Sequence, residues 1–120
     1  MVEGISMLLK LQLNERRCAF TEHEHDLEIS GFCPVSGNPR DGSRIRISYK
    51  GKDGFLEVAA LKAFVESYRG GKGEVRSMEG MLQEIAQACA DCLQVDVKLA
   101  ALLLIEPEQM MRVTCYAFPK

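Results

Sequence analysis

The sequence predicts an α+β domain in which antiparallel strands form a sheet and two helices cover one face of it. Apolar and polar residues alternate toward both ends of the chain, which is typical of half-buried strands. Two middle segments instead carry apolar residues at spacings of three and four, which is typical of helices. The length of 120 residues and the apolar content of 47% suit a single domain, residues 1–120, with an ordinary core.

The first part of the chain is expected to form strand, loop and strand. Residues 8–14 nearly alternate, which predicts a strand with one buried face. We expect the polar segment 21–26 to be solvated, and residues 27–30 to resume the alternation. Residues 44–49 alternate strictly, and the glycines and charges of residues 50–54 predict a turn.

Two helices are expected next. Over residues 56–69, one apolar stripe contains Leu61, Phe64, Val65 and Tyr68, and a glycine-rich run at 70–73 ends the helix. Ser77 is a good N-cap for a second helix that ends near Leu93.

Two final strands complete the predicted sheet. Residues 95–99 alternate, residues 106–108 form a turn around Pro107, and residues 110–116 have the composition of a strand. A small sheet of this kind has free edges, so we expect the chain to associate with copies of itself as a homo-oligomer.

Composition argues against several classes of function. The net charge of −2 is spread along the chain, so the basic patch typical of nucleic-acid-binding proteins is absent from the sequence. The longest apolar run, residues 99–105, is too short to cross a bilayer, and the first residues do not resemble a secretory signal. Five cysteines form an odd set, which favours reduced thiols and a cytoplasmic location.

The loop from Cys33 to Gly42 holds a thiol, a tight turn and a carboxylate between two strands. A lone cysteine is usually a small buried hydrophobe, but this one lies in a loop near Arg40 and Arg44, and nearby cations lower a thiol pKa. We therefore treat Cys33 as a candidate nucleophile and Asp41 as its proton donor. The alternative for Asp41 is a turn residue that bonds its own backbone.

The pattern Cys-Pro-Val-Ser-Gly-Asn-Pro at 33–39, followed by Asp41 and the strand Ile-Arg-Ile-Ser-Tyr at 45–49, resembles the QueF family of nitrile reductases. The resemblance continues to residue 69 through Glu57, the Leu-Lys pair at 61–62 and the Ser-Tyr-Arg run at 67–69. It implies the tunnelling fold, a ββααββ unit whose sheets join between subunits into a barrel with intersubunit active sites.

The resemblance also implies a reaction. The Cys33 thiol would add to the nitrile of 7-cyano-7-deazaguanine to form a thioimide, Asp41 would supply a proton, and two hydrides from NADPH would give the 7-aminomethyl base. By the same resemblance, the site residues would be Glu79, Glu57 and Ser77 for the substrate, and Lys62 and Arg69 for the cofactor.

The base-anchoring role of Glu79 has two alternatives. Glu74 takes it if the insertion in the glycine-rich loop is placed differently. The other alternative is that Glu79 is simply an acid in a first helical turn, where the helix dipole favours negative charge.

Three departures weaken the reductase assignment. Arg40 is an extra residue before Asp41, residues 57–60 read Glu-Val-Ala-Ala where reductases have Glu-Ser-Lys-Ser, and Met78 replaces a histidine. A QueF-like subgroup, the amidinotransferases, also lacks that motif and adds ammonia to the same nitrile within tRNA; residues 64–70 resemble it. We expect reduction first, amidination second, and a non-catalytic purine- or pterin-binding module third.

Two other clusters have simpler interpretations. Cys89 and Cys92 form a Cys-x-x-Cys pair on a predicted helix without a second ligand pair, so we expect core and helix-end packing. The run 22–26, Glu-His-Glu-His-Asp, could chelate a metal or join an intersubunit site, but a solvated segment is the expected interpretation. No metal site is predicted.

Overall fold

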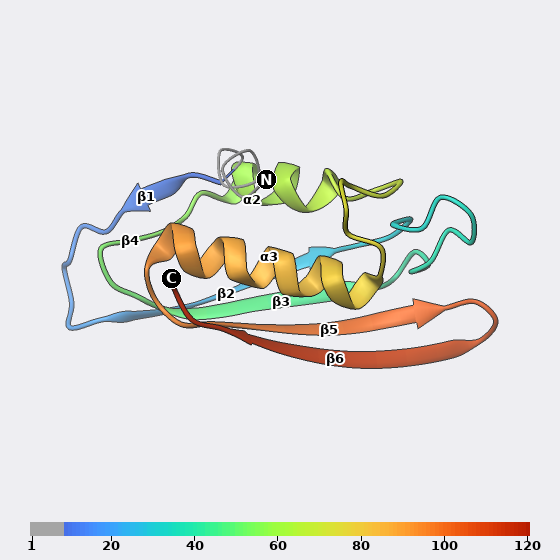
Figure 1. Ribbon diagram of the computed structural model, residues 1–120. Coiled ribbons are helices and arrows are strands. Elements are labelled where there is room, and N and C mark those ends of the chain that lie inside the picture. The colour runs from blue at the N-terminus through green and yellow to red at the C-terminus, as the bar shows by residue number, and fades with distance from the viewer. Residues whose placement is uncertain (1–8) are drawn as a thin grey trace.

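The computed structural model describes residues 9–120 (Figure 1). Its elements, in chain order, are β1 (Leu11–Leu13), β2 (Thr21–Glu28), β3 (Arg44–Gly51), β4 (Gly54–Leu56), α2 (Val58–Glu66), α3 (Met78–Leu93), β5 (Val97–Ile105) and β6 (Gln109–Ala117). Apart from the short strands β1 and β4, this is the predicted order of strands, two helices and two strands.

The main sheet contains four antiparallel strands in the order β2-β3-β5-β6. Figure 1 shows α2 and α3 on the same side of this sheet, with α3 lying along it. The predicted α+β class with antiparallel strands is therefore confirmed. The remaining strands, β1 and β4, pair with each other in a separate two-stranded sheet.

Strict alternation in β3 explains the position of the core. Ile45, Ile47 and Tyr49 face the helices and are buried, whereas Arg44 and Arg46 face the opposite side and are exposed. Helix α3 buries one face against the sheet, and its C-cap residue takes a left-handed conformation that ends the helix after Leu93. The predicted limits of this helix, from Ser77 to Leu93, are confirmed.

The expectation that residues 21–26 form a solvated segment is wrong, because β2 includes them. His23 and His25 occupy the helix-facing positions of this strand, and the alternate positions are acidic and exposed. The His23 ring stacks on Tyr49 and Phe55 at centroid distances of 5.1 and 5.3 Å. The sequence does alternate with a period of two here, but the inward positions hold histidines, and the pattern is usually recognised by aliphatic residues at those positions.

Two further expectations need correction. The strand predicted at 8–14 was expected to bury one face; residue 8 of it lies outside the described residues. The observed strand β1 spans Leu11–Leu13, and all three residues are exposed, because β1 pairs with β4 and not with the main sheet. The first helix is also shorter than predicted, because residues 54–56 pair as β4 and the helix begins at Val58.

Among residues 9–120, β2 and β6 each pair with a strand on one side and form the two edges of the sheet. On the face away from the helices, exposed acids of β2 lie beside exposed arginines of β3. Arg46 Nε lies 3.0 Å from the Asp26 carboxylate, and Arg44 lies 3.8 Å from that of Glu28. Such exposed pairs contribute little to stability, about 0–1 kcal/mol each, but they keep this face charged.

Among residues 9–120, no helix combines the length and the apolar character that a membrane span requires. Cys89 is fully buried in α3 and Cys92 is half-buried near the end of this helix, as the packing interpretation predicted. The same part of the chain contains no cluster of three or more His, Cys, Asp or Glu side chains arranged to hold a metal ion.

Candidate active site

The Cys33 loop closes through its own backbone. The N–H of Gly37 donates to the carbonyl of Cys33 at 2.8 Å, and the N–H of Cys33 donates to the carbonyl of Asn38 at 2.9 Å. Gly37 has φ +75°, a conformation that glycine adopts without the steric cost of a Cβ atom. These bonds leave the Cys33 side chain partly exposed at the base of a tight turn.

Three neighbouring elements hold this loop in place. Ile29 N–H donates to Ser43 at the start of β3, and Gly70 N–H donates to Gly31 from the turn after α2. The Asn38 side chain joins the loop to the β5–β6 turn, since its Oδ1 accepts from Glu106 N–H at 2.9 Å and its Nδ2 donates to Glu106 O at 3.4 Å. The loop is therefore supported from β3, from the end of α2 and from the β5–β6 turn.

Hydrogen bonding lowers the pKa of the Cys33 thiol. The largest contribution comes from the Ser36 side chain, followed by the backbone N–H groups of Ser36 and Val35; the Ser36 nitrogen lies 3.4 Å from Sγ. The sequence predicted that Arg40 and Arg44 would lower the pKa of Cys33. The pKa is lowered as expected, but the cause is hydrogen bonding within the loop and not these two cations. Donors aimed at the sulfur favour the thiolate, which is the nucleophilic form.

A cavity of about 410 Å³ lies beside Cys33. The turn from Gly70 to Gly73 forms part of its lining, together with Lys72 and Arg76. Sequence reasoning missed both cations, because the run Gly-Gly-Lys-Gly was interpreted only as a helix stop. A lysine inside a glycine-rich turn was the available signal.

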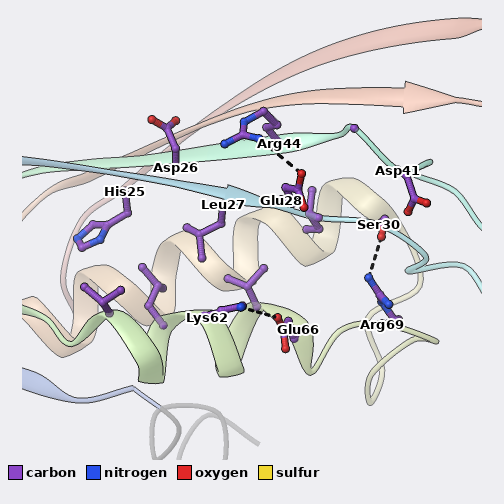
Figure 2. A pocket seen from close by; sticks show the side chains of 15 residues that line it. His25, Asp26, Leu27, Glu28, Ser30, Asp41, Arg44, Lys62, Glu66 and Arg69 are labelled. Carbon is purple, nitrogen blue, oxygen red and sulfur yellow. Dashed lines mark hydrogen bonds and ion pairs between the residues drawn. The ribbon is translucent and has the colours of Figure 1, made fainter.

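A larger groove of about 1060 Å³ lies between α2 and the edge strand β2 (Figure 2). It brings together three predicted site residues: Asp41, Lys62 and Arg69. Lys62 Nζ lies 3.9 Å from the Glu66 carboxylate, and Arg69 Nη2 donates to Ser30 Oγ at 2.9 Å. Burial, and then the charge of His23, lower the pKa of His25, which also lines this groove.

Asp41 and Cys33 therefore line different cavities. Arg40, the residue before Asp41, is bonded to the β5–β6 turn. Its N–H donates to the carbonyl of Leu104 at 2.7 Å and its guanidinium pairs with Glu106 at 3.3 Å, so the chain is drawn toward the β5–β6 turn before Asp41. Asp41 does not line the cavity beside the Cys33 sulfur. Its role as proton donor stays a prediction.

The remaining predicted residues lie at helix starts. Glu57 caps α2, since its carboxylate accepts from the N–H groups of Ala59 at 2.6 Å and Ala60 at 3.2 Å. Ser77 caps α3 through a 2.9 Å bond from Gly80 N–H. Glu79 is exposed in the first turn of α3 and Glu74 is exposed in the preceding turn. Their predicted contacts with substrate stay predictions.

Helix α3, whose first turn holds Glu79, packs against β5 and β6. Burial raises the pKa of the Cys115 thiol on β6, and the negative charge of Glu79 raises it further. The predicted base-anchoring carboxylate thus lies on the helix that packs on β5 and β6, and the groove follows the opposite edge of the sheet, β2.

Charges of both signs line the groove. Asp26, Glu28 and Arg44 occupy the strand positions that face away from the helices, where Arg44 lies 3.8 Å from Glu28, and on α2 Lys62 lies 3.9 Å from Glu66. The composition of this groove therefore does not decide whether Lys62 and Arg69 bind a cofactor, and that role stays a prediction.

Neither a protein-family model nor a curated protein matches this chain.

Proposed function

We propose that this protein is a nitrile-processing enzyme that captures 7-cyano-7-deazaguanine as a thioimide on Cys33. The observation that carries the proposal is the partly exposed thiol with a lowered pKa, held in a loop that three neighbouring elements support. A nitrile carbon is a modest electrophile, so attack requires a thiolate at a fixed position. The identity of the nitrile is taken from the resemblance of residues 33–49 to the QueF family.

In this reaction the Cys33 sulfur forms a bond to the nitrile carbon, and the nitrogen takes up a proton to give the thioimide. Hydrogen bonds to Sγ favour the thiolate before attack, and the geometry of the turn limits the positions that the sulfur can occupy. Asp41 is the expected acid. Its approach to the Cys33 sulfur stays a prediction.

An assembly of this kind agrees with the sheet. Within the described residues, β2 and β6 each leave one edge unpaired, and α2 and α3 cover one face. Pairing of β2 with β6 of another copy would extend the sheet toward the barrel of a tunnelling fold.

Two fates are proposed for the thioimide. Reduction to 7-aminomethyl-7-deazaguanine requires two hydrides and two protons, and it regenerates the thiol; NADPH is the expected hydride donor. Amidination requires attack of ammonia on the same carbon, with the thiol as leaving group. The second fate is favoured by α2, whose N-terminus reads Glu57, Val58, Ala59 without a cation.

The test is the intact mass of the protein after incubation with 7-cyano-7-deazaguanine, followed by peptide mapping. We expect an increase equal to one substrate molecule on Cys33. Cys33→Ala should abolish the adduct, and Cys18→Ala is the matched control, because Cys18 is also an exposed free thiol. If no adduct forms while Cys33→Ala still binds the base, the protein is a binding module and the proposal is wrong.

A second measurement distinguishes the two fates. Loss of NADPH absorbance together with disappearance of the adduct would indicate reduction. Incorporation of labelled ammonia into the product, without loss of NADPH, would indicate amidination.

A further inference from the structure

The edge strand β2 presents backbone hydrogen-bonding groups to solvent. The N–H of Ile29 donates to the carbonyl of Ser43 at 3.0 Å, and this bond continues the antiparallel register in which His25 faces Ile47. In such a ladder, alternate residues point their N–H and C=O groups toward the neighbouring strand. The odd-numbered residues of β2 therefore bond to β3. The N–H and C=O groups of the even-numbered residues point to the edge that is unpaired within residues 9–120.

The even-numbered positions of β2 are all acidic. They hold Glu22, Glu24, Asp26 and Glu28, which are exposed on the face away from the helices. The arginines of β3 lie on one side of this row, where Arg46 Nε is 3.0 Å from Asp26 and 3.7 Å from Glu24. A strand added on the other side would place side chains directly opposite the acids. Cationic side chains are favoured at such positions, and anionic ones are repelled.

The alternate positions of an added strand would face the groove between β2 and α2. Leu27 points from β2 toward α2 (Figure 2), and Val58, Leu61 and Val65 of α2 line the same groove, so its centre is apolar. Val58 is 70% exposed, which leaves apolar surface open to a ligand. The groove volume of about 1060 Å³ lies at the upper limit of ligand-binding clefts, for which about 300–1,000 Å³ is typical.

We propose that β2 and α2 form a docking site for an extended peptide of a partner protein, in which basic and apolar residues alternate. The peptide lies antiparallel to β2, as neighbouring strands of this sheet do. It bonds to the backbone of Glu24, Asp26 and Glu28, with its basic side chains opposite these acids and its apolar side chains in the groove. Main-chain bonds to a sheet edge give such a complex its affinity, and the alternate side chains give it specificity.

A second copy of this chain matches the charge of the edge less well. On the face away from the helices, its edge strand β6 holds Met110, Arg112, Thr114 and Tyr116, so a single cation would meet four acids. The peptide and a second copy would compete for β2. Binding of the peptide does not depend on the proposed reaction, and only its effect on assembly rests on the proposed function.

The test is NMR titration of the whole chain with the capped peptide Lys-Val-Lys-Val-Lys-Val-Lys. At about nine-tenths saturation, amide hydrogen exchange at Glu24 and Asp26 should slow about tenfold, because only the free fraction then exposes these N–H groups. The capped peptide Glu-Val-Glu-Val-Glu-Val-Glu should not slow it. N-methylation of the two inner lysines should abolish binding, since their N–H groups face β2, and N-methylation of two valines should not.

Variants of the protein test the side-chain contacts. Glu24→Gln should weaken binding of the lysine peptide about threefold, as one cross-strand charge pair provides. Val58→Ser should also weaken it, because the substitution removes apolar surface from the groove. Glu108→Gln is the matched control, since it removes one exposed acid from the β5–β6 turn. It should leave the affinity unchanged.

Three results would overturn the proposal. The first is that the lysine peptide does not bind, or binds no more tightly than the glutamate peptide. The second is that Glu108→Gln has the same effect as Glu24→Gln. The third is that the amides of Glu24 and Asp26 are protected before peptide is added and stay equally protected afterwards, since a second copy then occupies the edge. Adduct formation on Cys33 needs no peptide, so failure of the proposed function is distinguishable from failure of this site.

Discussion

Replacement of Asn38 by alanine tests whether contacts with the β5–β6 turn hold the nucleophile loop. The change removes the 2.9 Å bond from Glu106 N–H and the longer 3.4 Å bond to Glu106 O, while the backbone of the loop is unaltered. A protein hydrogen bond contributes about 0.5–1.5 kcal/mol, and the longer bond contributes at the lower limit, so the free energy of unfolding should fall by about 1–2 kcal/mol.

Urea denaturation measures the stability loss, and the melting temperature should fall by roughly 4–8 °C. Alkylation of Cys33 by iodoacetamide at neutral pH measures the function of the loop. The rate should be lower in Asn38→Ala, because a loosened turn no longer directs the Ser36 donors at the sulfur.

Asn14→Ala is the matched control. Asn14 also joins a loop through two side-chain hydrogen bonds, one to Lys52 O at 3.1 Å and one from Arg16 N–H at 2.9 Å, but these bonds lie away from the Cys33 loop. It should lower stability without changing alkylation of Cys33. The reasoning is refuted if Asn38→Ala and Asn14→Ala alkylate at the same rate, or if Asn38→Ala is as stable as the parent.

Three other predictions concern the thiol, the pH dependence and the core. Ser36→Ala should raise the thiol pKa of Cys33, so the pH profile of alkylation should move to higher pH; an unchanged profile would mean that the hydroxyl is not the main donor. The pKa of His25 is lower in the folded protein than in the unfolded chain. Its contribution to the free energy of unfolding is therefore present above about pH 6.5 and is lost as the pH falls through the lower folded pKa. His25→Gln should flatten the fall in stability below about pH 6.5, as measured by urea denaturation. Ile47→Ala should cost about 2–5 kcal/mol in the same assay, since Ile47 has no exposed surface and truncation leaves a cavity; a loss below about 1 kcal/mol would mean that the site collapses around the smaller side chain.

The local pattern of the sequence determined the strongly periodic elements. Arg44–Tyr49 and the helix after Ser77 were predictable because one face of each is buried and the opposite face is solvated, which imposes a period of 2 or 3.6 on the residues. The last hairpin was predictable in part, since the strand expected at 95–99 is β5, which runs from Val97 to Ile105. The Cys33 turn was predictable for a similar local reason, since Gly37 and the prolines restrict the backbone directly.

The composition of the site was decided by the tertiary structure. Lys72 and Arg76 lie more than thirty residues from Cys33 in sequence, and they share its cavity because the end of α2 bonds back to Gly31. Asp41, although close to Cys33 in sequence, lines the groove because Arg40 bonds to the β5–β6 turn. Both outcomes depend on pairings between distant segments, which local periodicity and turn propensities do not specify.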